Sequence, residues 1–178
     1  KFSNTKIFKI LIFLFFYFSI LIGFYFDENP TIGPKIDFTN HLKTLEAFEI
    51  DLKYALLNFH NNDYPTRISP IFLLYLHYLK MLIPNVELLR FFSLNIYIIS
   101  PFIFYFCLKL KFKSIDKIKL FIFSLLICLS PSFRANTIWP ESSMLALIFF
   151  LISIYFYLKF KENKKFFYVL LNIVFLSI

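Results

Sequence analysis

A run of about 20 nearly uninterrupted apolar residues close to the start of the chain limits what this protein can fold into. The run covers 7–26 and reads IFKILIFLFFYFSILIGFYF. At ~1.5 Å of rise per residue, a helix of this length crosses the ~30 Å hydrocarbon core of a bilayer. The run is longer than the apolar part of a signal peptide, and no small-residue cleavage site follows it. We therefore expect a transmembrane helix here.

Further apolar runs predict an all-α, polytopic transmembrane protein. Hydrophobic residues make up 59% of the chain and the mean hydropathy is +0.70, which excludes a soluble globular class. Cys107 and Cys128 both lie in apolar runs and are expected to be buried packing residues. The chain begins with Lys1 and stops inside an apolar run, so we expect a piece of a longer protein. The further expected spans are roughly 88–108, 118–133, 142–158 and 166–178.

Lysines gather in three segments at the ends of the expected spans. These are the N-terminus, 109–119 (KLKFKSIDKIK) and 159–165 (KFKENKK). Cytoplasmic segments of membrane proteins carry an excess of Lys and Arg, so all three are expected in the cytoplasm. The segments 27–87 and 134–141 then lie on the extracytoplasmic side. The net charge of +8 thus reflects membrane orientation, and no nucleic-acid partner is expected.

The long outer segment is expected to contain two amphipathic juxtamembrane helices. In 37–59, apolar side chains recur near the helical period and charged residues interrupt them elsewhere. The apolar stretch 69–83 is short for a span, and a crossing there would place the Lys-rich 109–119 outside. We expect both helices to lie in the plane of the membrane interface. The stretch between them, 60–70 (HNNDYPTRISP), is rich in turn residues.

Acidic side chains in the two outer segments are the candidate functional residues. Asp27 and Glu28 follow the first span, and hydrated surface charge is the simple explanation for both. Asp37 is expected to begin the first surface helix, where a carboxylate can act as a cap, and His41 shares its helix face. Glu141, within WPESS, lies at an expected membrane boundary, where an acidic residue is costly unless it is paired or functional.

Arginines in the outer segments, and Arg90 at the start of the expected span 88–108, are candidate phosphate ligands. Arg134 shares the short segment 134–141 with Glu141, which leaves two alternatives: a structural ion pair, or a phosphate-binding Arg134 beside an assisting Glu141. Arg67 and Arg90 either bind phosphate or reach anionic lipid headgroups. Trp139 is typical of the aromatic belt at a membrane interface.

The order of these features resembles the N-terminal module of the GT-C superfamily, integral membrane glycosyltransferases that use polyprenyl-phosphate-linked sugars. The matching order is a span, an acid that opens an amphipathic helix, and a second surface helix after the turn PTRISP. A span, a basic cytoplasmic segment and the acid-containing FRANTIWPESS follow. RANTIW is also similar to the arginine–asparagine–tryptophan loop of the dolichyl-phosphate-glucose alpha-1,2-glucosyltransferases of N-glycan assembly. The chain has no Asp-x-Asp pair, which leaves the metal requirement open.

This resemblance implies a hexosyltransferase-type membrane enzyme that moves a sugar from a polyprenyl-phosphate donor to an acceptor at the extracytoplasmic face. Asp37 would be the general base or hold a divalent cation such as Mg²⁺ or Mn²⁺, and Glu141 would be the second essential carboxylate. Arg67 or Arg134 would stabilise the departing lipid phosphate. Membrane lipids would surround the enzyme. The residues expected to contact substrate or phosphate are Arg67, Arg134, His41, Asp27 and Glu28.

Two other classes of function stay open at this point. A multi-span transporter or flippase would need polar residues within its spans, where this sequence offers Ser, Asn and Tyr. A non-catalytic membrane assembly protein follows if every acidic residue has only a structural role. Inverted or parallel repeats in a complete sequence would favour the transporter.

Overall fold

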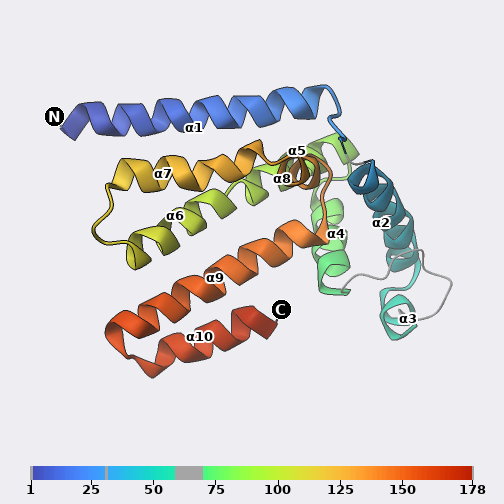
Figure 1. The fold of residues 1–178 in the computed structure, drawn as a ribbon. Coiled ribbons are helices and arrows are strands. Elements are labelled where there is room, and N and C mark those ends of the chain that lie inside the picture. The colour runs from blue at the N-terminus through green and yellow to red at the C-terminus, as the bar shows by residue number, and fades with distance from the viewer. Residues whose placement is uncertain (1, 31, 59–69, 178) are drawn as a thin grey trace.

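The computed structural model describes residues 2–30, 32–58 and 70–177, and this part of the chain forms helices without strands (Figure 1). The predicted all-α class is therefore confirmed. The elements in chain order are α1 (Phe2–Tyr25), α2 (Gly33–Ile50), α3 (Leu52–Leu57), α4 (Pro70–Leu82), α5 (Val86–Tyr97), α6 (Ser100–Lys111), α7 (Lys117–Leu125), the 3₁₀ turn η1 (Leu126–Leu129), α8 (Pro131–Ile138), α9 (Ser142–Asn163) and α10 (Phe166–Ser177).

Among the described residues, three helical segments are long and apolar enough to cross a membrane, and a bent pair of helices would make a fourth if it forms one span. The three segments are Lys6–Tyr25 of α1, Val86–Lys111 of α5 and α6 together, and Ser142–Asn163 of α9. They coincide with the first, second and fourth predicted spans. Within the most apolar 18-residue stretch, only 17% of α1 and 22% of α9 is buried inside the protein. Most of the apolar surface of these two helices therefore needs an apolar surrounding. A lipid environment meets that need.

The predicted span 118–133 is wrong as one straight helix. The segments Lys117–Leu129 and Pro131–Ile138 form a pair bent by 71°. Pro131 lacks a backbone N–H and forces extended backbone on Ser130, whose hydroxyl accepts a hydrogen bond from Phe133 N at 3.4 Å. The chain therefore stops and restarts as α8. Arg134 consequently lies on a helix rather than in the outer loop predicted at 134–141.

The last helix, α10, is shorter than a complete span. Its 12 residues extend only ~18 Å at ~1.5 Å per residue. Lys164 adopts the left-handed conformation with φ 55° and turns the chain back at the end of α9. Asn172 then joins α10 to α9 by donating to the Ser153 backbone oxygen at 2.8 Å and to its hydroxyl at 2.7 Å.

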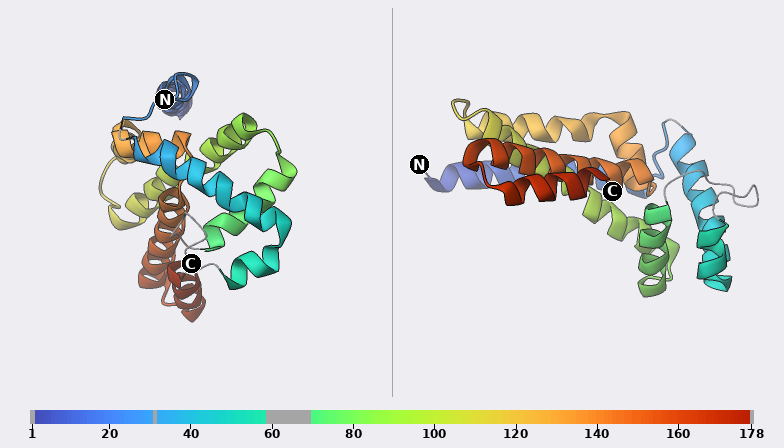
Figure 2. Two further views of the ribbon diagram at one scale, coloured as in Figure 1. Left: turned by 90° about the vertical axis from the view of Figure 1, so that its right-hand side faces the viewer. Right: turned by 90° about the horizontal axis from the view of Figure 1, so that it is seen from below.

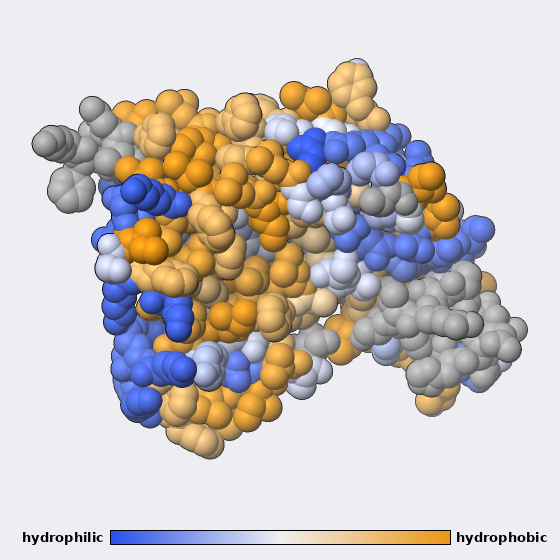
Figure 3. All heavy atoms as spheres, in the orientation of Figure 1, coloured by the Kyte–Doolittle hydropathy of each residue, from blue (hydrophilic) through white to orange (hydrophobic). Residues whose placement is uncertain are grey.

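The helices arrange the chain into two chemically different ends. In Figures 1 and 2, α1, α6, α7, α9 and α10 run along one axis, and the N-terminus, the α6–α7 turn and the α9–α10 turn share one end. We call the part formed by 109–119 and 159–165 the Lys-rich end. The helices α2, α3 and α4 lie across the opposite end, which we call the capped end. Figure 3 shows hydrophilic side chains at both ends and an apolar band between them.

The predicted surface helix 37–59 begins earlier than expected and is interrupted. Pro34 lies in the first turn of α2, a position where its missing N–H is harmless. Asp51 has extended backbone, with φ −151° and ψ 96°, and its carboxylate accepts a hydrogen bond from Tyr54 N at 2.9 Å. Asp51 therefore ends α2 and caps α3. Asp37 lies a full turn inside α2, so it is near the start of the helix but does not cap it.

The second predicted surface helix, 69–83, appears as α4. With 13 residues it is too short to cross a bilayer alone. It packs on α2 through an ion pair between Lys80 and Glu49 at 2.7 Å and through the rings of His77 and Phe48, whose centroids are 6.0 Å apart. The position of α2 and α4 relative to a membrane stays a prediction. The turn PTRISP, with Arg67, lies outside the described residues.

The two ends should react with a membrane-impermeant thiol reagent from opposite sides. Lys113→Cys, at the Lys-rich end, should react only from the cytoplasm, and Lys43→Cys, on α2, only from outside. Both lysines are exposed, whereas the native Cys107 and Cys128 are 4% and 1% exposed and should give little background. Labelling of intact and permeabilised cells measures this. Reaction of Lys113→Cys from outside would contradict the topology.

Candidate functional site

The C-terminal end of α1 forms a turn that positions two carboxylates. Glu28 N donates to Gly23 O at 2.8 Å and Asp27 N donates to Phe24 O at 3.2 Å, the two hydrogen bonds of a Schellman motif. Asp27 occupies the left-handed position with φ 51°. Asp tolerates this conformation better than most residues other than glycine and asparagine. The turn presents two adjacent acidic side chains to the helices around it.

Asp27 binds Arg90 of α5. The Arg90 residue is only 2% exposed. Arg90 Nη2 donates to Asp27 Oδ1 at 2.8 Å, and Nη1 donates to both carboxylate oxygens of Glu87 at 3.0 and 2.9 Å. The guanidinium stacks on Trp139, with Cζ 3.5 Å from the ring centroid. Two carboxylates and an aromatic face thus compensate a charge that would be costly to bury alone. Trp139 is 5% exposed, so its ring packs against the protein, and its predicted place at a membrane interface stays a prediction.

Glu28 binds Arg134 of α8. Arg134 Nε donates to both Glu28 oxygens at 2.9 and 3.1 Å, and Nη2 also contacts Oε2. Ser19 of α1 accepts the remaining donors, through its hydroxyl at 2.7 Å and its backbone oxygen at 3.0 Å. Arg134 is therefore engaged in joining α8 to α1. The structural alternative of an Arg134–Glu141 ion pair is wrong, because each residue has a different partner.

Gly23 makes the contact between α1 and this ion pair possible. A Cβ atom at Gly23 would overlap Glu28 Oε2 and lie 2.9 Å from Arg134 Nη2. The chain contains only two glycines, and this one interrupts an apolar helix. The turn brings Glu28 back over residue 23, and glycine leaves the space for its carboxylate.

Glu141 and His41 meet in a buried pair between α9 and α2. His41 Nε2 lies 3.3 Å from Glu141 Oε1, and the two side chains are 3% and 12% exposed. Glu141 also caps α9 by accepting a hydrogen bond from Ser142 N at 3.2 Å. The His41 ring packs against Phe72 of α4, with centroids 5.3 Å apart. The structure thus pairs His41 with Glu141, while Asp37 is exposed on α2 rather than directed at the same place.

Several buried polar atoms around this pair lack a hydrogen-bond partner in the described part of the chain. They include both ring nitrogens of His41 and Glu141 Oε1. The hydroxyls of Tyr75, Ser93 and Tyr97 lie close enough to interact with one another but are not in hydrogen-bonding geometry. Tyr97 interacts electrostatically with both Tyr75 and Glu141, which places these groups in one neighbourhood. Burial raises the pKa of the Tyr75 phenol, and the nearby Ser93 and Tyr97 hydroxyls oppose that rise. We call these five residues the buried polar cluster.

A metal site is not assembled by the described residues. No group of three or more His, Cys, Asp or Glu side chains lies close enough there to hold an ion. Asp37 is exposed and forms no side-chain ion pair with another described residue. It offers one carboxylate to a cation such as Mg²⁺ or Mn²⁺, and the other ligands would have to come from elsewhere.

Comparison with protein-family models, with curated proteins and with solved structures found no match to this chain. The site is therefore interpreted from its own chemistry. It combines a carboxylate–imidazole pair, which can accept a proton, with hydroxyl groups that can bind polar ligands. Two arginines whose charges are already compensated hold the helices around it.

Gly23→Ala should destabilise the protein, although alanine normally stabilises a helix relative to glycine. The added methyl would displace Glu28 from Arg134, and we expect a loss of about 1–3 kcal/mol in the free energy of unfolding. Gly33→Ala is the matched control, since the added Cβ would lie 3.9 Å from Asp37 Oδ2, an ordinary van der Waals distance, and it should be neutral or stabilising by up to about 1 kcal/mol.

Chemical unfolding in detergent measures both variants, and Glu28→Gln completes the test. If Gly23→Ala acts through Glu28, its effect in the Glu28→Gln background should be smaller than in the wild type. Equal effects in the two backgrounds would contradict the assigned contact.

Proposed function

We propose that this chain carries the N-terminal module of a polytopic membrane glycosyltransferase. It would transfer a sugar from a polyprenyl-phosphate donor to an acceptor at the extracytoplasmic face. The observation that carries the proposal is the buried polar cluster, which lies where α2 and α4 meet the apolar bundle. The sequence layout, which resembles the GT-C superfamily, supports the same conclusion.

The buried polar cluster has the chemistry of a carbohydrate subsite. Buried polar groups are nearly always hydrogen-bonded, and leaving one unsatisfied costs about 1–3 kcal/mol. Sugar hydroxyls both donate and accept, so they match a mixture of carboxylate, imidazole and hydroxyl groups. Glu141 would accept the proton of a hydroxyl or orient it, and His41 would fix the position of the carboxylate.

Asp37 supplies an exposed carboxylate on the same helix as His41. The two residues are four positions apart, about 6 Å along the helix axis. In the proposed mechanism Asp37 stays the first candidate for general base, as the resemblance implies, because it is free to approach an acceptor. Glu141 would hold the sugar in the buried polar cluster. The two acids would then act on different parts of one substrate complex.

The donor phosphate needs a cation that is not already neutralised. Arg90 and Arg134 are bound by acidic residues, so the proposal assigns them to the scaffold. Lys35 is a new candidate, since its side chain is 49% exposed and its amine lies 4.7 Å from the Trp139 ring centroid. Its only described acidic partner is Asp27 at 3.9 Å. Arg67 stays a candidate from the sequence.

A transporter is the second candidate, and two observations favour it. Arg90 and Glu87 lie inside the candidate span Val86–Lys111, so this span carries charged residues as well as Ser, Asn and Tyr. The bent pair Lys117–Leu129 and Pro131–Ile138 has the form of a broken span or a re-entrant segment. Charged residues inside spans and broken helices are features of substrate pathways in transporters.

Asp37→Asn should lower the rate of sugar transfer at least about 10²-fold if Asp37 is the general base, because the amide cannot take up the proton. Glu141→Gln should reduce turnover less, since its amide oxygen can still cap α9 and bind a hydroxyl. Glu46→Gln is the matched control, because Glu46 is exposed on α2 and has no described ion pair. The assay measures transfer from polyprenyl-phosphate sugars by the purified full-length protein.

Wild-type rates in the Asp37 and Glu141 variants would refute the catalytic assignment. Absence of transfer by the wild type, together with movement of a labelled lipid-linked substrate between leaflets of a proteoliposome, would favour the transporter.

A further inference from the structure

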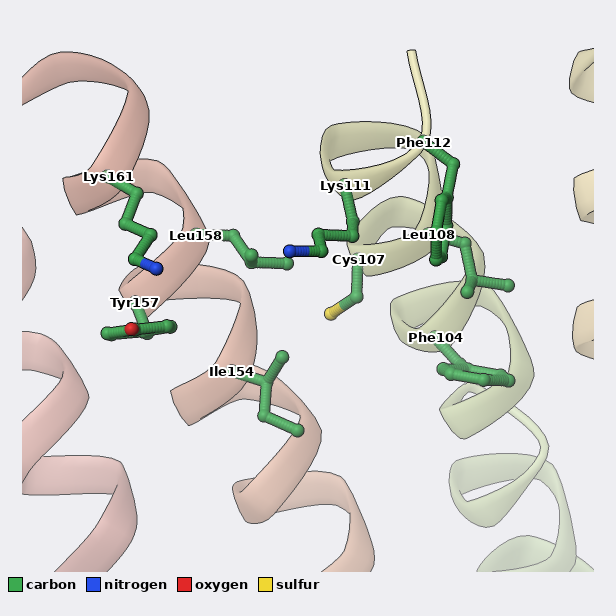
Figure 4. A pocket seen from close by; sticks show the side chains of 9 residues that line it. All are labelled: Phe104, Cys107, Leu108, Lys111, Phe112, Ile154, Tyr157, Leu158 and Lys161. Atoms are coloured by element: carbon green, nitrogen blue, oxygen red, sulfur yellow. The ribbon is translucent and has the colours of Figure 1, made fainter. Parts of the chain in front are cut away.

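A groove opens between α6 and α9 at the Lys-rich end, far from the buried polar cluster (Figure 4). Its volume is about 330 Å³, near the lower limit of about 300 Å³ for small-molecule sites. Figure 4 shows Lys111 and Cys107 of α6 and Leu158 and Ile154 of α9 directed into the space between the two helices. The lining residues are Phe104, Cys107, Leu108, Lys111, Phe112, Ile154, Tyr157, Leu158 and Lys161.

The two helices make contact beside the groove. Cys107 Sγ donates a weak hydrogen bond to Leu151 O at 3.5 Å, which joins α6 and α9. Ile154 and Leu158 follow on α9 and continue the apolar wall toward Lys161. Lys111 lies one turn beyond Cys107 on α6 and reaches toward α9 in Figure 4. The groove is thus apolar along the helices and cationic at its mouth.

The positive charge at this mouth is not compensated by the described acidic residues. Glu162, which follows Lys161 in the sequence, is bound by Lys113 at 2.7 Å and by Lys159 at 3.5 Å. Asp116, the acid closest to Lys111 in the sequence, caps α7 by accepting hydrogen bonds from the backbone of Ile118 and Lys119. Neither Lys111 nor Lys161 forms an ion pair with an acid in the part of the chain that the structure describes. The Lys161 amine instead lies 5.1 Å from the ring centroid of Tyr157.

We propose that this groove binds one anionic phospholipid. Its phosphate lies between Lys111 and Lys161, and one acyl chain follows the apolar wall formed by Phe104, Leu108 and Ile154. A free phosphate ion or a nucleotide would not cover the apolar wall along its length, whereas a lipid places an acyl chain on the wall and a phosphate at the lysines. The groove lies on helices with a membrane-spanning composition, so lipid is also its natural neighbour. This proposal does not depend on the proposed sugar transfer.

Lipid binding by matched double variants tests the proposal. Phosphatidylglycerol and phosphatidylcholine with identical acyl chains are titrated into the detergent-solubilised protein, and bound lipid is counted by native mass spectrometry. Lys111→Gln with Lys161→Gln should lower the affinity for phosphatidylglycerol by about tenfold or more, given ~1 kcal/mol for each lysine near an anionic lipid. Lys109→Gln with Lys165→Gln removes the same charge from the same end, at exposed residues that neither line the groove nor hold Glu162, and should leave that affinity nearly unchanged.

Two further measurements distinguish a lipid site from an ion site and from diffuse charge attraction. Ile154→Trp should occupy the space along the apolar wall and weaken the binding of phosphatidylglycerol, although both lysines stay in place. Inorganic phosphate in excess should not displace the lipid, whereas displacement would show an ion site and overturn the proposal. Equal loss of affinity in the two lysine pairs would show diffuse charge attraction and overturn the proposal. No loss of affinity in either pair would overturn it as well. Unfolding temperatures equal to the wild type confirm that each variant is folded.

Discussion

The packing of this chain depends on the turn that ends α1. Two adjacent carboxylates leave that turn and bind arginines on different helices, Asp27 with Arg90 of α5 and Glu28 with Arg134 of α8. Three segments that are far apart in the sequence are thereby held together at the capped end. Both pairs are at least partly buried, so removing one partner would leave a charge poorly solvated. The arginines also suit this place better than lysines, because a planar guanidinium binds two oxygens and stacks on Trp139.

The helical spans were largely predictable because they follow from local composition. Apolar runs of sufficient length predict helices in lipid, and the runs beginning near 7, 88 and 142 are helical as expected. The breaks within two predicted helices, 118–133 and 37–59, were also indicated by nearby residues, but the hydropathy pattern does not show them. Ser130 before Pro131 is a typical helix start, and Asp51 is a typical cap. A prediction based only on the length of an apolar run therefore joins two helices into one, although residues such as Ser130 and Pro131 separate them.

The partners of the charged residues were not predictable from one sequence. Sequence distance suggested that Arg134 would meet Glu141 and that Asp37 would act with His41. In the structure the ion pairs of the site join residues 63 and 106 positions apart, which only tertiary packing decides. Gly23 did carry a signal, because glycine is rare in this chain and disfavoured within a helix. That signal indicates a close contact but does not identify the neighbour.

Trp139 gives the capped end a built-in optical reporter. It is the single tryptophan of the chain, and its ring contacts the cations of Arg90 and Lys35 and lies beside Phe38 of α2. Indole emission depends on the charges and the water close to the ring. Any separation of α2 from the bundle would therefore change the intrinsic fluorescence of the protein without an added dye. The residue that stacks on the buried arginine thus also makes movement at this end visible in solution.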